Sequence, residues 1–175
     1  MSDVTFNLKE NSIKIHQSQA ESWTITLVDT GDDTMTGGRL RRVKKYLKGE
    51  TEFCFTYGDG VADVDITALI KFHKSHGKEA TLTATRPLGR FGALQFGENN
   101  SIERFEEKPQ GDGGWVNGGF FVLHPDVIDR IEGDSCSWEG SPLVSLARDG
   151  QLKSFKHEGF WQPMDTLREK NYLNK

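Results

Sequence analysis

An aspartate between two glycines follows a strongly apolar run, because Gly58-Asp59-Gly60 comes shortly after Phe53-Cys54-Phe55. The apolar run predicts a buried strand, and in open α/β sheets ligands bind beyond the carboxyl ends of the strands. Glycine has no Cβ, so the backbone on either side of the carboxylate can approach a ligand closely. We therefore predict that Asp59 holds a metal ion beside a bound molecule. The alternative is a tight turn in which aspartate takes a preferred position.

Other polar segments are also flanked by glycine, proline or aromatic residues. They are Asp29-Thr30-Gly31, Thr36-Gly37-Gly38-Arg39, Glu107-Lys108-Pro109, Asn117-Gly118-Gly119 and Met164-Asp165-Thr166. Together they supply what phosphoryl chemistry needs. Two carboxylates can hold Mg²⁺, which takes oxygen ligands and usually only one or two from the protein. A lysine can neutralise a phosphate. Each segment also has an ordinary interpretation: Asp165 as a helix N-cap, and Lys108 as a solvated loop residue.

The glycine pair before Arg39 opens a predicted helix. Backbone N–H groups at a helix N-terminus attract anions, and the arginine could add a forked contact. We therefore expect the N–H groups at Gly37 and Gly38 to point outward toward an anion.

Hydrophobic periodicity predicts the elements that must position these residues. We expect a hairpin over 4–15, strands at 23–27, 52–57, 79–85, 115–123 and 153–156, a second hairpin from 91–96 and 102–106, and helices over 37–48, from 66 to about 76, from 124, over 142–147 and from 166. Thr36 is the predicted N-cap of the helix over 37–48, and Asp63 or Asp65 that of the helix from 66, with Gly77 just past its end. Strands and helices alternate over 52–85, which favours a mostly parallel α/β core with added β-hairpins in a single domain over 1–175.

The overall composition excludes several classes of protein. With 175 residues the chain can bury a sizeable core. The net charge of −4 gives no basic field for nucleic acid or an anionic membrane. We expect no signal peptide and no membrane span, since no apolar run approaches the required length. Cys54 and Cys136 are far apart in sequence and are expected to be reduced, which favours a cytoplasmic protein.

The resemblance to a known family becomes specific in six stretches that run over essentially the whole chain. They are LVDTGDDTMTGGRLRRV, FTYGDGVADVDI, TLTATRPLGRFGAL, FEEKP, NGGFFVL and GFWQPMDTLREK. The chain resembles the sugar-phosphate nucleotidylyltransferase family, in which GDG and EKP are widely shared. TGGR and FWQPMDT are typical of its cytidylyl branch, the glucose-1-phosphate cytidylyltransferases. The resemblance implies a Rossmann-like nucleotide-diphospho-sugar transferase fold.

The resemblance also implies a reaction and the residues that perform it. CTP and α-D-glucose 1-phosphate would give CDP-glucose and pyrophosphate with Mg²⁺, a step toward the dideoxysugars of surface polysaccharide such as O-antigen. The implied roles are Asp59 and Asp165 as metal ligands, Lys108 beside Glu107 at the sugar phosphate, Asn117 and Gly118 in the sugar pocket, Thr34 and Arg39 near the nucleotide, and Gly58 near its ribose or base, with Asp59, Lys108 and Asp165 as the catalytic set. Relatives are commonly oligomeric, so the resemblance leaves a homo-oligomer open.

The chain departs from the family in one respect. The family begins with a strand and a loop of the form GG-x-GTR that cradles the triphosphate, followed by a lysine in a KPKP-like segment. Neither motif occurs in the 175 residues. We therefore expect an N-terminally truncated, partial nucleotidyltransferase domain with an exposed sheet edge.

Two other functions remain open from the sequence. Asp63-Val64-Asp65 is a D-x-D pattern, which is typical of metal-dependent glycosyltransferases. These carboxylates can equally cap the helix that follows them. A chain without the family's glycine-rich loop could also be an inactive fragment, or a subunit that depends on a partner chain.

Overall fold

A computed structural model describes residues 3–16, 22–87, 93–96, 98, 101–106 and 114–174. Its strands are β1 (Val4–Asn7), β2 (Ser12–Ile15), β3 (Phe53–Thr56), β4 (Gly60–Ala62), β5 (Ala80–Thr85), β6 (Ala93–Phe96), β7 (Ile102–Glu106), β8 (Val116–Leu123), β9 (Leu152–Lys156) and β10 (Trp161–Pro163). Its helices are α1 (Thr36–Arg42), α2 (Ile66–His76), α3 (Ser141–Arg148) and α4 (Leu167–Leu173), with 3₁₀ turns η1 (Lys44–Leu47) and η3 (Pro125–Arg130). Among these described helices, none is long and apolar enough to cross a membrane.

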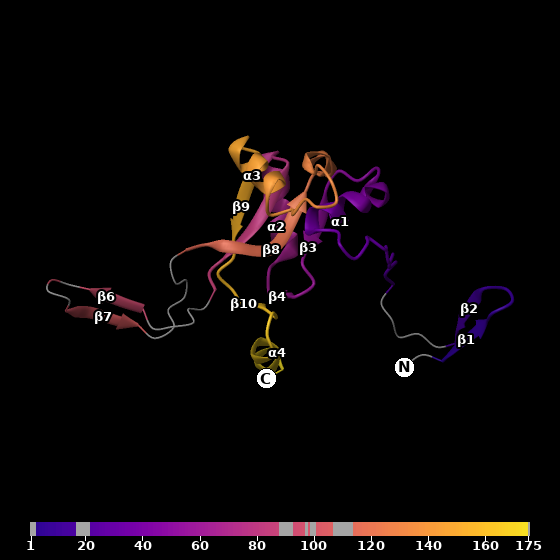
Figure 1. The fold of residues 1–175 in the computed structure, drawn as a ribbon, viewed down its shortest axis with the longest axis horizontal. Coiled ribbons are helices and arrows are strands. Elements are labelled where there is room, and N and C mark those ends of the chain that lie inside the picture. The colour runs from indigo at the N-terminus through magenta and orange to yellow at the C-terminus, as the bar shows by residue number, and fades with distance from the viewer. Residues whose placement is uncertain are drawn as a thin grey trace.

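A four-stranded sheet in the order β3-β8-β5-β9 forms the centre of the molecule (Figure 1). Strand β8 is antiparallel to both β3 and β5, whereas β5 and β9 are parallel. Three of the four strands therefore share one direction, which confirms the α/β class and the mostly parallel strand directions. The alternation over 52–85 did not reveal that β8, from much later in the chain, lies between β3 and β5.

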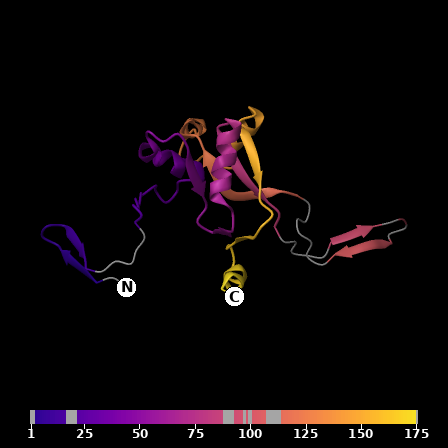
Figure 2. The same ribbon diagram turned by 180° about the vertical axis from the view of Figure 1, so that it is seen from behind.

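Helices cover both faces of this sheet. Helix α2 packs on one face, where it contacts β5, β8 and β9 (Figure 2). On the other face lies the main core, which gathers α1, η3, α3 and the segment that contains Trp138. Its fully buried members include Phe121 and Leu123 of β8, Val127 and Ile128 of η3, and Leu146 of α3. The core therefore joins segments from residue 40 to residue 146 around β8.

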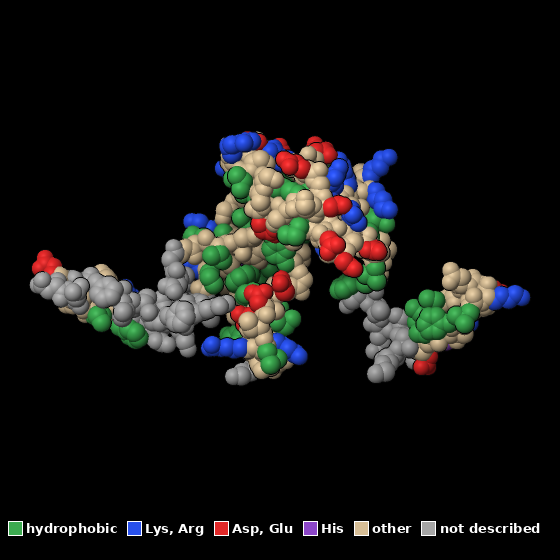
Figure 3. Space-filling model, in the orientation of Figure 1, with side chains coloured by type: hydrophobic (Ala, Val, Ile, Leu, Met, Phe, Trp, Pro, Cys, Tyr) green, Lys and Arg blue, Asp and Glu red, His purple; other side chains and the backbone are tan. Residues whose placement is uncertain are grey.

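Two hairpins lie apart from the core, as the sequence predicted. Strands β1 and β2 pair antiparallel, as do β6 and β7. Figure 1 shows them projecting on opposite sides of the sheet. In β1–β2 the apolar side chains Val4, Phe6, Ile13 and Ile15 are all exposed, and Figure 3 shows this apolar surface on the hairpin.

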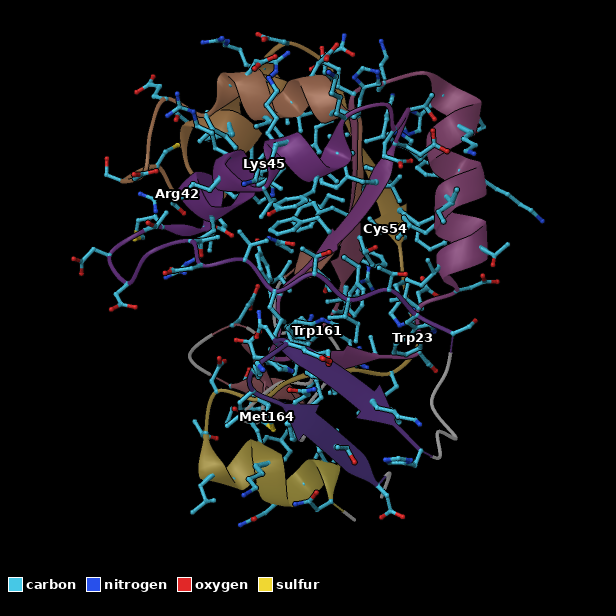
Figure 4. All side chains as sticks on the ribbon, turned by 90° about the vertical axis from the view of Figure 1, so that its right-hand side faces the viewer. Trp23, Arg42, Lys45, Cys54, Trp161 and Met164 are labelled. Carbon is cyan, nitrogen blue, oxygen red and sulfur yellow. The ribbon has the colours of Figure 1, made fainter. Side chains whose placement is uncertain are left out.

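Three local predictions were wrong. The alternating segment around Trp23, Ile25 and Leu27 forms no strand, because no described segment pairs with it through backbone hydrogen bonds. The three side chains are 72–92% exposed. Figure 4 shows Trp23 away from the core. Met35, not Thr36, is the N-cap of α1, which ends at Arg42. Strand β3 was expected to be buried, but it lies at a sheet edge and leaves Cys54 exposed.

Helix α2 begins and ends as its sequence indicates. The side chain of Asp65 accepts a hydrogen bond of 2.8 Å from the N–H of Ala68. Gly77 follows the last turn with φ +61°, a left-handed conformation that glycine adopts at little cost. Of the two candidate caps named from the sequence, Asp65 is therefore the one used.

The buried side of α2 carries two histidines that share one hydroxyl. Nδ1 of His73 lies 2.9 Å from the Thr81 hydroxyl, and Nε2 of His76 lies 2.8 Å from it. Burial lowers the pKa of both imidazoles. The charged or titratable groups around them are Glu52, Lys74, Lys78, His124 and Lys153. Burial together with these neighbouring charges leaves the pKa values of His73 and His76 below the ordinary 6.5.

This pair predicts a loss of stability in weak acid. The unfolded chain binds these protons near pH 6.5, whereas the folded chain binds them only at lower pH. Stability is therefore complete above that value and decreases as the pH falls through it. We expect a lower melting temperature at about pH 5.5 than at about pH 7.5, and a weaker pH dependence in His73→Asn. A variant that keeps the wild-type pH dependence would contradict the assignment.

Candidate active site

A short antiparallel ladder brings the two predicted metal ligands together. Strand β4 follows Asp59 directly, and β10 ends two residues before Asp165. The two strands pair with Gly60 opposite Pro163. The N–H of Met164 donates a 2.8 Å hydrogen bond to the carbonyl of Asp59. Residues 106 positions apart in sequence therefore become backbone neighbours, and Figure 4 shows Trp161 and Met164 of this region between the core and α4.

The carboxylates of Asp59 and Asp165 are exposed. Within the described part of the chain, no side chain forms a hydrogen bond or ion pair with either of them. Asp165 was also a candidate N-cap, but Thr166 caps α4 instead. Its hydroxyl accepts from the N–H of Glu169, whose carboxylate accepts from the N–H groups of Asp165 and Thr166. Among the described residues, the side-chain oxygen atoms of both aspartates therefore remain available to another ligand, and carboxylate oxygens suit Mg²⁺.

The Asn117-Gly118-Gly119 segment lies in β8 at an irregularity opposite β5, where the register shifts between Leu82 and Ala84. The carboxamide oxygen of Asn117 accepts from the N–H of Gly119 at 2.8 Å. The indole N–H of Trp161 donates to the carbonyl of Gly118, also at 2.8 Å. Gly119 has φ +77°, and a Cβ there would lie 2.7 Å from the Tyr57 ring. This segment therefore contacts both β10, the strand that precedes Asp165, and Tyr57, the residue two positions before Asp59.

A hydrogen-bonded group around Tyr57 and Glu139 was missed by the sequence analysis. The phenol of Tyr57 donates to the Glu139 carboxylate and accepts from the Asn117 amide at 3.3 Å. The hydroxyl of Thr36 donates to the same carboxylate at 2.8 Å. Tyr57 precedes the glycine–aspartate motif, which is a weak signal. Glu139 is 82 residues further along the chain, and its neighbours in sequence give no sign of the contact.

Helix α1 differs from its predicted role as an anion site. Its first turn is covered by the segment 134–138: the N–H of Gly38 donates to the Cys136 carbonyl, and a Cβ on Gly38 would lie 2.5 Å from the Asp134 carbonyl oxygen. The glycine pair therefore serves close packing, and the N–H of Gly38 does not point outward toward an anion. Arg39 donates to the Thr30 hydroxyl at 2.7 Å and to the Asp32 carbonyl at 3.1 Å, and so holds the preceding loop.

The remaining predicted residues have different environments. Thr34 is buried (7% exposed) directly before α1. Gly58 is exposed beside Asp59, and among the described residues no atom other than those of its chain neighbours would lie within 4 Å of a Cβ there. Glu107 and Lys108 lie outside the described residues.

Both carboxylates of the D-x-D segment have structural partners. An oxygen of the Asp63 carboxylate lies 3.0 Å from Nε2 of the largely buried His157, and Asp65 caps α2. Neither belongs to the pair formed by Asp59 and Asp165. This arrangement favours the helix-capping interpretation of the segment over the glycosyltransferase one.

Comparisons with known proteins show what the chain is similar to. The chain is 60% identical over 173 residues to the glucose-1-phosphate cytidylyltransferases of Salmonella typhi and Salmonella typhimurium. These matches cover 99% of this chain and 67% of each relative. The crystal structure of HddC from Yersinia pseudotuberculosis shares the fold, with a TM-score of 0.57 and 21% identity over 79% of this chain and 60% of that one. The chain thus spans about two thirds of the length of these curated relatives and 60% of the length of the solved structure.

A family model supplies the assignment. The model described as "Nucleotidyl transferase" matches residues 5–166, which is most of the chain and includes both aspartates of the candidate metal pair. The Rossmann-like α/β core and the curated relatives agree with that match. The chain therefore belongs to the nucleotidyl transferase family.

Proposed function

We propose that the chain is part of a Mg²⁺-dependent glucose-1-phosphate cytidylyltransferase, which converts CTP and α-D-glucose 1-phosphate to CDP-glucose and pyrophosphate. The observation that carries the proposal is the pairing of β4 with β10, which places Asp59 beside Asp165. Identity of 60% to curated relatives of that name supports the choice of substrates. We further propose that the product serves surface-polysaccharide synthesis in the cytoplasm; an oligomeric state remains a prediction.

The reaction needs alignment and charge neutralisation more than covalent chemistry. A phosphate oxygen of the sugar phosphate forms a bond to the α-phosphorus of CTP while the bond to the leaving pyrophosphate breaks. Both reactants are anions, so groups that hold them together in line lower the barrier. Asp59 and Asp165 would hold Mg²⁺, which when bound neutralises charge on the phosphates. Lys108 would bind the sugar phosphate, and the amide of Asn117 would contact the sugar.

The direct test is an assay of substrate use. First, the DNA upstream of the Met1 codon is sequenced to see whether it encodes, in frame, a segment with the GG-x-GTR loop. The protein is then produced with any such segment included. It is then incubated with Mg²⁺, glucose 1-phosphate and CTP, UTP, dTTP or GTP in separate reactions. We expect pyrophosphate and a nucleotide sugar to form, fastest with CTP. Equal rates with UTP or dTTP would contradict the cytidylyl assignment.

The same assay separates the other functions. A glycosyltransferase consumes nucleotide sugar and releases no pyrophosphate from CTP. An inactive fragment gives no product, and CTP does not raise its melting temperature. A partner-dependent subunit gains activity when a chain that supplies the glycine-rich loop is added.

A further inference from the structure

The Tyr57–Glu139 contact links two regions to which the family resemblance gives different substrates: the nucleotide near α1 and the sugar near Asn117. Glu139 directly follows the segment 134–138 that covers the first turn of α1, and its carboxylate accepts from the hydroxyl of Thr36, the first residue of that helix. Tyr57 lies between β3 and Asp59, and its ring packs edge-on against Phe55 and Phe121, with centroids 5.7 and 5.9 Å away. Asn117 lies in β8, at the proposed sugar pocket. The hydrogen bonds between these side chains therefore run from the nucleotide side of the site to the sugar side.

The direction of these hydrogen bonds is fixed by chemistry. An ionised carboxylate can only accept, so the Tyr57 hydroxyl must donate its one hydrogen to Glu139. The phenol oxygen can then only accept, and it does so from the amide nitrogen of Asn117. This leaves the carboxamide oxygen facing the N–H of Gly119, which donates to it at 2.8 Å. A flipped carboxamide would place its oxygen against the phenol oxygen, which are two acceptors, and its NH₂ group against the N–H of Gly119, which are two donors.

The environment keeps Glu139 ionised and Tyr57 protonated. Burial raises the pKa of Glu139, but hydrogen bonds from Ser137, Tyr57 and Thr36 outweigh it and hold the pKa below its ordinary value. Burial, and then the hydrogen bond to Glu139, raises the pKa of the Tyr57 phenol well above its ordinary value. At neutral pH each group is therefore in the state that the hydrogen-bond directions require.

We propose that Tyr57 and Glu139 are positioning residues that fix the orientation of the Asn117 carboxamide toward the sugar phosphate. The proposal rests on the proposed function for the identity of that ligand. An amide nitrogen carries two hydrogens. One is donated to Tyr57, which leaves the second to donate to a sugar hydroxyl. Without Tyr57 the carboxamide could turn and present its oxygen instead, so sugar binding would weaken while CTP binding stayed the same.

The orientation is tested first by NMR, which does not depend on activity. The side-chain amide signals of Asn117 are assigned by their loss in Asn117→Asp and then followed in Tyr57→Phe. This substitution keeps the ring and its packing but removes the hydroxyl. We expect the Asn117 signals to shift in Tyr57→Phe and to stay in place in Tyr46→Phe, where an exposed tyrosine makes no such contact. Unchanged signals in Tyr57→Phe would overturn the proposal.

The kinetic test separates positioning from a general structural role. In Tyr57→Phe we expect the KM for glucose 1-phosphate to rise about three- to tenfold, as the loss of one hydrogen bond implies, with the KM for CTP unchanged and the melting temperature slightly lower. Glu139→Gln keeps an acceptor oxygen and should show a smaller effect than Glu139→Ala. Equal increases in both KM values would overturn the proposal. If the wild-type protein makes no CDP-glucose, the proposed function fails, while the NMR result still decides the orientation.

Discussion

Asp59→Asn should lower kcat/KM for CDP-glucose synthesis by about 100-fold or more, because asparagine keeps the size of the side chain but loses the charge that would bind Mg²⁺. The same substitution should change the free energy of unfolding by less than about 0.5 kcal/mol, since the carboxylate is exposed and has no side-chain partner among the described residues. Asp165→Asn should behave in the same way. Steady-state kinetics at several Mg²⁺ concentrations, together with thermal denaturation, measure both effects.

Asp63→Asn is the matched control for this prediction. It removes a carboxylate four residues away that pairs with His157 and lies outside the Asp59–Asp165 pair. We expect its activity to stay within about twofold of wild type, because loss of a single hydrogen bond away from the reacting groups has a small effect. If Asp63→Asn were inactive and Asp59→Asn were not, the metal assignment would be wrong and the D-x-D interpretation would return.

The main strands and helices could be predicted because each carries a local signal. The apolar run of β8, the Asp65 cap with Gly77 at the end of α2, and the apolar segments of β6 and β7 all depend on residues close together in sequence. The segment with Trp23 shows the limit of such signals. Alternation indicates that a segment can be a strand, but a strand also needs a neighbour, and pairing between distant segments leaves no local pattern. The position of β8 between β3 and β5 was missed for the same reason.

The candidate site shows the same contrast between local sequence signals and contacts that form between distant segments. Asp59 and Asp165 could be selected from residue type and flanking residues, and the resemblance to a family paired them. The prediction for the N–H of Gly38 was wrong, because a glycine pair at a helix start fits an anion and close packing equally well. Only the contact of Gly38 with Asp134 decides between them. Nothing in the residues beside Glu139 indicated a role at the site, because its partners Tyr57 and Thr36 are 82 and 103 residues away in sequence.

Trp138→Ala should have the largest effect on stability, with a loss of about 3–5 kcal/mol in the free energy of unfolding, the range for a large buried aromatic. Trp138 is fully buried and packs edge-on against Phe55 and Phe121, with ring centroids 6.1 and 5.9 Å away. Trp138→Phe should lose less, because it keeps an aromatic ring and removes an indole N–H that has no hydrogen-bond partner among the described residues. Denaturant unfolding measures all three proteins.

Trp23→Ala is the control, since that side chain is 75% exposed and should change the free energy of unfolding by less than about 0.5 kcal/mol. Equal losses at the two tryptophans would mean that the core is not centred on Trp138.

Trp138 also connects the stability of the core with the candidate site. Its backbone N–H donates to the Thr36 hydroxyl, which in turn donates to Glu139, the next residue in the chain. A cavity at Trp138 should therefore loosen the segment that orients Tyr57, so Trp138→Phe should raise the KM for glucose 1-phosphate more than the KM for CTP.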